Sequence, residues 1–160
     1  MAKKIFSLLF LVLTVSCLDN VDDNTFDCAL FDPAFPVITI TYLDDQGNNL
    51  IRNGTLNPDD ISVLFSDGSV GGTVILPGAN EENSDNNVLD YTVSIALPRS
   101  ESESYTIQLN DETMDELLLM ASRQDLPCNI SYFIPTNATY NGVNTTLIED
   151  GIDFRIRIVL

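Results

Sequence analysis

Alternation of apolar and polar residues is the dominant pattern of this chain. In residues 37–43, Ile38, Ile40 and Tyr42 alternate with threonines, and the same period of two recurs several times further along. A period of two with β-branched and aromatic residues is typical of half-buried strands. The pattern therefore predicts strands over residues 37–43, 61–65, 72–76, 91–97, 105–109, 128–134 and 152–160.

The segments between these strands have turn chemistry. They are rich in Gly, Asn, Asp and Ser, and Asn141-Gly142 lies between two strand-like stretches. Asn-Gly is the favoured pair for a two-residue hairpin in which both residues have positive φ. We therefore predict a tight hairpin at Asn141-Gly142.

Residues 111–123 do not follow the alternation. Asn110 and the acidic residues after it suit a helix start, whereas Leu117 to Met120 form a contiguous apolar block instead of a helical stripe. The block favours a strand over residues 116–122, and a short helix remains the alternative.

Together these elements predict an all-β chain. About seven to nine short strands separated by turns are typical of a single β-sandwich, of the immunoglobulin-like or transthyretin-like kind, and a small closed barrel also fits. The chain has no Trp, so the core tryptophan of immunoglobulin domains is missing. No internal repeat is present, which argues against a solenoid or propeller.

The first residues have the zones of a secretory signal. Lys3 and Lys4 precede an apolar run over residues 5–15, and Thr14 and Ser16 are small enough for a signal peptidase. As a helix the run covers about 16 Å, against a hydrocarbon core of about 30 Å, so it is too short for a lasting anchor. We therefore predict a signal peptide over residues 1–16.

A cysteine follows at once. The segment from Val12 to Cys17 resembles a bacterial lipobox, although Leu13 stands one position before the usual place of the leucine. This resemblance implies that Cys17 becomes the acylated N-terminus and anchors the protein in a membrane. Ordinary cleavage, with Cys17 as a free or paired thiol, is the alternative.

The residues after Cys17 are acidic and poor in apolar side chains, which is typical of a tether. They also resemble the acidic export signal of surface lipoproteins of the Bacteroidota, and the chain is similar in general style to the small surface lipoproteins of flavobacteria. The resemblance implies an outer-membrane location, facing the cell exterior. We predict an acidic tether and lead-in over residues 17–35 and a β-sandwich domain over residues 36–160.

Two further cysteines remain. Cys28 and Cys128 lie 100 residues apart and form an expected disulfide in an oxidising compartment. A loop of this length stabilises by roughly 4–5 kcal/mol in the chain-entropy model. Two buried free thiols are the alternative.

Charge excludes several partners. From Cys17 onward the chain has five Arg and no Lys against 24 Asp and Glu, a formal net charge of −19 before the termini are counted. Such a chain repels phosphate backbones, so we predict no nucleic-acid partner. Contact with the membrane is expected through the lipid alone.

The residues that most enzymes use are missing. There is no His, and both lysines lie in the leader. This excludes Ser-His-Asp catalysis, histidine metal sites and lysine Schiff bases, so we predict a protein that is not an enzyme and has no cofactor. A carboxylate-based glycoside hydrolase is the least favoured function. A weak surface Ca²⁺ site is the one metal hypothesis, in the Asp- and Asn-rich stretches at 43–49, 57–60 and 80–87.

These observations predict a lipid-anchored, non-enzymatic binding or adhesion module whose partner is a glycan or an envelope protein. A structural accessory subunit of an outer-membrane complex is the alternative. No ligand-binding residue is singled out by the sequence.

The anchor is directly testable. Because Cys17 is the expected site of the acyl chains, Cys17→Ser should move the protein from the membrane fraction to the soluble fraction, measured by fractionation and immunoblotting. Cys28→Ser, which leaves the lipobox intact, is the control. Membrane retention of Cys17→Ser would contradict lipidation.

Overall fold

The computed structural model describes residues 27–77 and 89–160. The chain divides into two compact units, Met1–Phe31 and Asp32–Leu160. In the first unit the described residues are 27–31, where the Asp27 carboxylate accepts a hydrogen bond from the Ala29 amide at 2.9 Å. The expected signal peptide at 1–16, Cys17 and most of the tether lie outside the described residues.

The second unit is built from strands. Its described residues contain ten strands and two 3₁₀ turns. The strands are β1 Ile38–Leu43, β2 Ser62–Phe65, β3 Val70–Ile75, β4 Thr92–Ile95, β5 Ser102–Gln108, β6 Met114–Asp125, β7 Ser131–Tyr140, β8 Val143–Thr145, β9 Leu147–Asp150 and β10 Asp153–Val159. The turns are η1 Pro58–Asp60 and η2 Pro127–Asn129. The prediction of an all-β chain is confirmed.

All ten strands belong to one mixed sheet, in the order β8-β7-β6-β5-β2-β3-β4-β1-β10-β9. Neighbours are antiparallel, except that β1 pairs with β10 in parallel over the full length of β1. The first and last parts of the domain therefore lie side by side in the middle of one half of the sheet.

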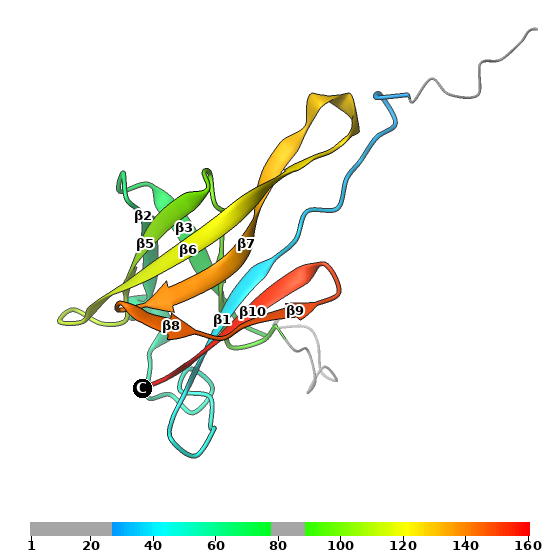
Figure 1. Ribbon diagram of the computed structural model, residues 1–160. Helices are drawn as coiled ribbons and strands as arrows, with labels where there is room; N and C mark the ends of the chain where they lie inside the picture. The colour runs from blue at the N-terminus through cyan, green and yellow to red at the C-terminus, as the bar shows by residue number, and fades with distance from the viewer. Residues whose placement is uncertain (1–26, 78–88) are drawn as a thin grey trace, which may run out of the picture. The chain divides into compact units, whose positions relative to one another are not determined.

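The two edge strands are consecutive in the chain. Only Thr146 separates β8 from β9, yet β8 pairs with β7 and β9 pairs with β10. Residues 143–150 thus cross from one end of the sheet to the other (Figure 1), and the sheet is nearly closed into a barrel. The Thr145 hydroxyl donates to the Arg157 carbonyl at 3.2 Å, which ties β8 to β10.

Three expectations about the elements can be compared with this sheet. The two-layer sandwich of about seven to nine strands is not confirmed, because one curled sheet buries a single face on itself. The favoured strand at 116–122 is confirmed as part of the longer β6, and the helix over 111–123 is wrong. The strand expected at 128–134 begins only at Ser131, because Cys128 and Asn129 adopt positive φ in η2.

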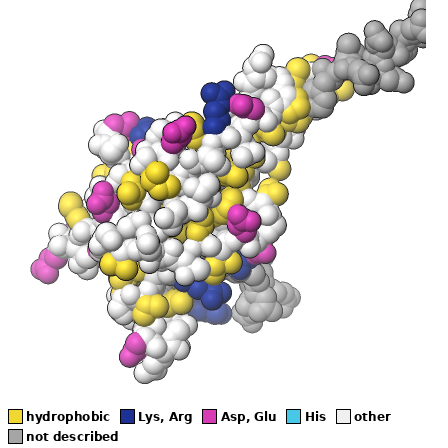
Figure 2. Space-filling view, viewed as in Figure 1, with side chains coloured by type: hydrophobic (Ala, Val, Ile, Leu, Met, Phe, Trp, Pro, Cys, Tyr) yellow, Lys and Arg dark blue, Asp and Glu magenta, His cyan; other side chains and the backbone are white. Residues whose placement is uncertain are grey.

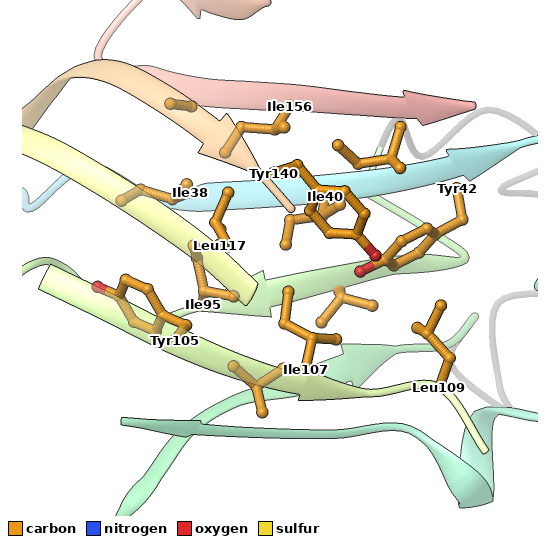
Figure 3. Close-up of a cluster of buried hydrophobic side chains, with 14 of the residues drawn as sticks. Ile38, Ile40, Tyr42, Ile95, Tyr105, Ile107, Leu109, Leu117, Tyr140 and Ile156 are labelled. Carbon is orange, nitrogen blue, oxygen red and sulfur yellow. The ribbon is translucent and has the colours of Figure 1, made fainter. Parts of the chain in front are cut away.

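The core follows the predicted alternation. In β1, Ile38, Ile40 and Tyr42 are fully buried, and equivalent inward positions in β5 and β10 hold Tyr105, Ile107 and Phe154, among others. Figure 3 shows such side chains from β1, β4, β5, β6, β7 and β10 lying together. The buried apolar residues of the described chain are Ile38, Ile40, Tyr42, Leu50, Ile51, Leu56, Val63, Phe65, Val93, Ile95, Tyr105, Ile107, Leu109, Leu117, Leu119, Ala138, Tyr140, Phe154, Ile156 and Ile158.

Two features shape the sheet locally. Asn141 and Gly142 have φ of 49° and 78° and join β7 to β8, which confirms the predicted hairpin. A bulge in the β2–β3 pair falls at Gly71, and a Cβ on the next residue, Gly72, would lie 2.4 Å from the Ser94 carbonyl oxygen. Glycine at 72 therefore permits β3 to approach β4 closely enough to pair.

A buried polar group stands beside Tyr42. The Tyr140 hydroxyl donates to the Asp115 carboxylate at 2.6 Å, and the Asn141 side-chain amide donates to the same carboxylate at 2.7 Å. The Tyr42 hydroxyl points toward that of Tyr140 (Figure 3) but is buried without a hydrogen-bond partner among the described residues. Burial raises the pKa of Tyr42 and of Tyr140, so both phenols stay protonated.

This arrangement predicts unequal effects of removing the two hydroxyl groups. Tyr140→Phe leaves a buried carboxylate without one donor and should lower the free energy of unfolding by about 1–3 kcal/mol. Tyr42→Phe removes a buried hydroxyl without a hydrogen-bond partner among the described residues, so it should lower the free energy of unfolding less than Tyr140→Phe does. Urea unfolding of both variants measures the difference, and equal losses would contradict the hydrogen-bond assignment.

Candidate binding surface

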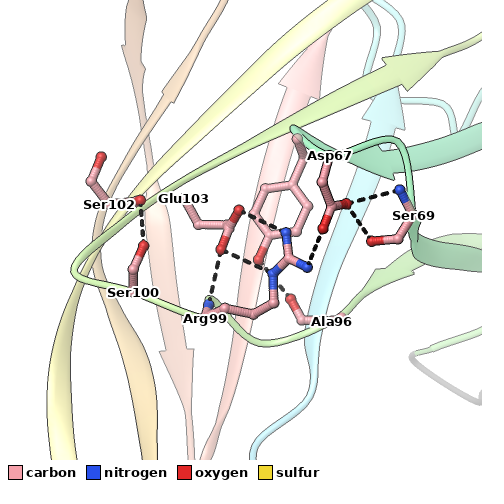
Figure 4. Close-up of polar contacts among 8 residues, drawn as sticks. Asp67, Ser69, Ala96, Arg99, Ser100, Ser102 and Glu103 are labelled. Atoms are coloured by element: carbon pink, nitrogen blue, oxygen red, sulfur yellow. Dashed lines mark hydrogen bonds and ion pairs between the residues drawn. The ribbon is translucent and has the colours of Figure 1, made fainter.

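A cluster of polar side chains is centred on Arg99, in the loop between β4 and β5. Its guanidinium carbon lies 3.7 Å from the centre of the Phe65 ring, and its Nη1 donates to the Asp67 carboxylate at 2.9 Å. The guanidinium also donates to the buried Glu103, whose carboxylate accepts the Arg99 backbone amide as well (Figure 4). Each charge in the cluster has a partner, so the cluster serves to fix the loop against the β2–β3 turn.

The same cluster lowers the pKa of the Asp67 carboxyl. The Ser69 hydroxyl and amide, followed by the Arg99 guanidinium, lower the pKa of Asp67 from 3.8 to about 2. The folded state therefore binds the Asp67 proton less readily than the unfolded state does.

In two of the three stretches considered for calcium, side-chain oxygens accept hydrogen bonds within their own turn. Asp44 already accepts hydrogen bonds from the Gln46 and Asn48 amides and from the Asn48 side chain. At 57–60 the Asn57 side chain binds the Asp60 carboxylate at 3.0 Å and accepts from the Asp59 amide. These loops use their oxygens to hold their own turns. The stretch at 80–87 lies outside the described residues, and the described chain contains no group of three or more metal-ligating side chains.

The structure describes the two predicted disulfide cysteines but not the predicted lipidation site. Cys17 lies outside the described residues. Cys28 and Cys128 are both disulfide-bonded in the structure, which fits the expected bond between them. Within the described residues no helix has the length and apolarity needed to span a membrane.

The sheet leaves two hollows where residues 143–150 cross between its ends. The crossing is oblique, because β8 covers only the last residues of β7 and β9 covers only the first half of β10. One hollow therefore opens between β7 and the β9–β10 hairpin, and the other between β8 and the end of β10. We call them the β7–β9 hollow and the β8–β10 hollow.

The β8–β10 hollow has a volume of about 350 Å³. It combines exposed apolar residues with amide and hydroxyl groups and with the exposed guanidinium of Arg157. Its lining residues are Tyr140, Asn141, Val143, Asn144, Thr145, Arg157, Ile158, Val159 and Leu160.

The β7–β9 hollow has a volume of about 240 Å³ and is lined almost entirely by apolar and aromatic residues. Its lining residues are Ala34, Pro36, Tyr132, Ile134, Glu149, Gly151, Ile152 and Phe154. Phe35 packs edge-on against Tyr132 with ring centres 5.4 Å apart. Figure 2 shows hydrophobic side chains at the surface between β7 and the β9–β10 hairpin.

Two large apolar side chains at this hollow remain in water. Phe35 is 45% exposed and Ile152 is 58% exposed, one in the lead-in to β1 and the other in the β9–β10 turn. The alternation in residues 152–160 predicts Ile152 on the same face as Phe154, but Ile152 lies in the turn between β9 and β10 and is exposed. Apolar groups gathered around a hollow are characteristic of interaction sites.

Sequence reasoning assigned no ligand-binding residue, and this surface explains the omission. Its members come from the lead-in, β7, β9 and β10, and only the closure of the sheet brings them together. One signal was present in the sequence: Glu149 is two residues after Leu147 in a strand-like stretch, so the two side chains should lie on the same face. No family model, curated protein or solved structure matches the chain.

The Asp67 pKa generates a pH prediction. A carboxylate with a lowered folded pKa contributes stability above its unfolded pKa, near 3.8, and loses this contribution as the pH falls toward about 2. Asp67→Asn should therefore flatten the decline in stability across this range, measured by urea unfolding at a series of pH values. Asp111→Asn, which removes a charge from an exposed turn, is the control. The same acid decline in wild type and Asp67→Asn would contradict the assignment.

Proposed function

We propose that this protein is an exported, lipid-anchored binding module of the outer cell surface, without catalytic activity. The sandwich expected from the sequence is replaced by a nearly closed sheet. In this proposal the sheet is the scaffold, Cys17 carries the anchor, and the β7–β9 hollow with Phe35 and Ile152 is the recognition surface.

The proposed location rests on the N-terminal sequence. A short apolar leader ends at Cys17, and an acidic stretch follows it. Disulfide-bonded Cys28 and Cys128 fit an oxidising compartment outside the cytoplasm. The strong negative charge keeps the domain away from anionic lipid, so a lipid anchor on a tether suits it.

The observation that carries the binding role is the apolar surface around the β7–β9 hollow. Exposed Phe35 and Ile152 flank a hollow that the sheet leaves open, although their burial would stabilise the protein by about 25 cal/mol per Å². Covering these side chains with a partner would recover that energy. The scaffold is suited to presenting them, because β10 beneath the hollow is paired on both sides.

A protein partner suits this surface better than a glycan does. Sugar sites need several directed polar groups, and the side chains that line this hollow offer only the Glu149 carboxylate and the Tyr132 hydroxyl. The two buried acids of the described chain, Glu103 and Asp115, are engaged in structural hydrogen bonds, which supports a non-catalytic role.

Loss of the two exposed side chains should weaken partner binding. Fluorescently labelled Cys17→Ser protein, which should be soluble, is added to intact cells that lack the gene, and bound fluorescence is measured. Phe35→Ala with Ile152→Ala should weaken binding by at least about tenfold, since buried interface anchors each contribute about 1–2 kcal/mol or more.

The matched control is Val70→Ala, because Val70 is an apolar residue on another part of the sheet and is 76% exposed. Unchanged binding by the double variant would remove the hollow from the proposal. Binding that survives protease treatment of the cells but is lost after glycan removal would replace the protein partner with a glycan.

A further inference from the structure

A carboxylate occupies an inward position of the sheet at the β7–β9 hollow. In the β9–β10 pair, Leu147 stands opposite Ile156 and Glu149 stands opposite Phe154. Residues opposite one another in an antiparallel pair share a face of the sheet, and Ile156 and Phe154 are buried in the core. Glu149 therefore lies on the core-facing side, where the sheet otherwise carries mostly apolar residues.

Glu149 also has no counter-charge. Within residues 27–77 and 89–160 its carboxylate makes no ion pair or hydrogen bond, whereas the neighbouring Asp150 pairs with Arg155. Asp153, at the start of β10, accepts the Val37 amide at 2.8 Å. The acids around the hairpin are thus engaged, and Glu149 alone is available to a partner.

This carboxylate sets a condition on what can cover the hollow. While the hollow is open, water solvates the Glu149 side chain, which is exposed. A purely apolar partner would strip that water and leave an uncompensated charge, at a cost that exceeds the gain from apolar contact. A cationic partner would instead form a charge-assisted hydrogen bond at a site that the partner shields from solvent.

We propose that the β7–β9 hollow receives an Arg or Lys side chain from a partner protein, with the charge on Glu149 and apolar residues of the partner on Phe35 and Ile152. The proposal rests on the proposed function and names the chemistry of its partner. The net negative charge of the exported chain would also speed the approach of a basic segment.

The size of the hollow favours a side chain over a free small molecule. Its volume of about 240 Å³ is below the roughly 300–1,000 Å³ of pockets that enclose drug-sized ligands. The aliphatic stem of Arg or Lys matches the apolar walls, and a guanidinium can stack on Tyr132 or Phe154. Phe35 is not among the residues that line the hollow, so only a longer segment reaches it together with Ile152.

The strand edges beside the hollow argue against a partner that simply adds a strand. Pro135 lies within β7 and has no amide hydrogen to donate, and a bulge follows at Thr136. An inward-facing charge such as Glu149 is another feature that protects an edge from strand addition. Recognition by one inserted side chain is compatible with both features.

The test compares two synthetic peptides that differ by one charge. Both are short and extended, with valines on either side of a central residue, which is Arg in one peptide and its neutral isostere citrulline in the other. Each is titrated into the ¹⁵N-labelled exported protein, and amide shifts give the affinity and the location of binding. The Arg peptide should shift the amides of Tyr132, Ile134 and residues 149–154 and bind at least about tenfold more tightly than the citrulline peptide.

Variants assign the charge. Glu149→Gln should reduce the affinity for the Arg peptide to that for the citrulline peptide, while Glu112→Gln, at an exposed turn, should leave it unchanged. Equal affinities of the two peptides, or equal effects of the two variants, would overturn the proposal. N-acetyl-arginine methylamide is the third probe, and binding as tight as that of the Arg peptide would replace the protein segment with a small cation.

The peptide and cell-binding experiments together distinguish failure of this proposal from failure of the proposed function. If cell binding depends on Phe35 and Ile152 but the Arg peptide does not bind, the surface is retained and its cationic occupant is wrong. If cell binding is also independent of these residues, both proposals fail.

Discussion

Every strand of this domain depends on the sheet curling far enough to cover its own inner face. One face of a single sheet carries the core side chains, and no helix or second sheet in the described chain lies over them. The crossing of residues 143–150 from β7 to β10 completes that curl. Because the crossing strand is short and oblique, it cannot cover the full length of both neighbours, and the two hollows are the direct result.

Much of the local structure could be predicted from sequence. Ile38, Ile40 and Tyr42 alternate with threonines, and all three are buried. The pattern predicts this because a period of two places alternate side chains on the face that meets the core. Asn141-Gly142 was equally informative, since few other pairs tolerate positive φ at both positions. The block at 117–120 was ambiguous because contiguous apolar residues suit a strand and a helix alike, and pairing with β5 and β7 decided it.

The arrangement of the strands and the surface around Glu149 could not be predicted in the same way. Alternation identifies the inward side of a strand but not its neighbour, so a sandwich and a curled sheet gave the same pattern. Glu149 lies on the same side of its strand as Leu147. The neighbouring residues do not reveal, however, that the turn at Gly151 sets the register of β9 against β10. Ile152 is exposed for the same reason: the turn, and not the alternation, determines the direction of its side chain.

The parallel pairing of β1 with β10 has a consequence for how this protein acquires its fold. The Val37 amide bonds to Asp153, 116 residues further along the chain, and β10 is the last strand of the sheet. Until the final residues emerge, β1 lacks one neighbour and the curl cannot close. Contacts of such high sequence separation make folding slow, since the entropy of a long loop must be lost first. The inner face of the sheet therefore stays uncovered until β10 pairs with β1.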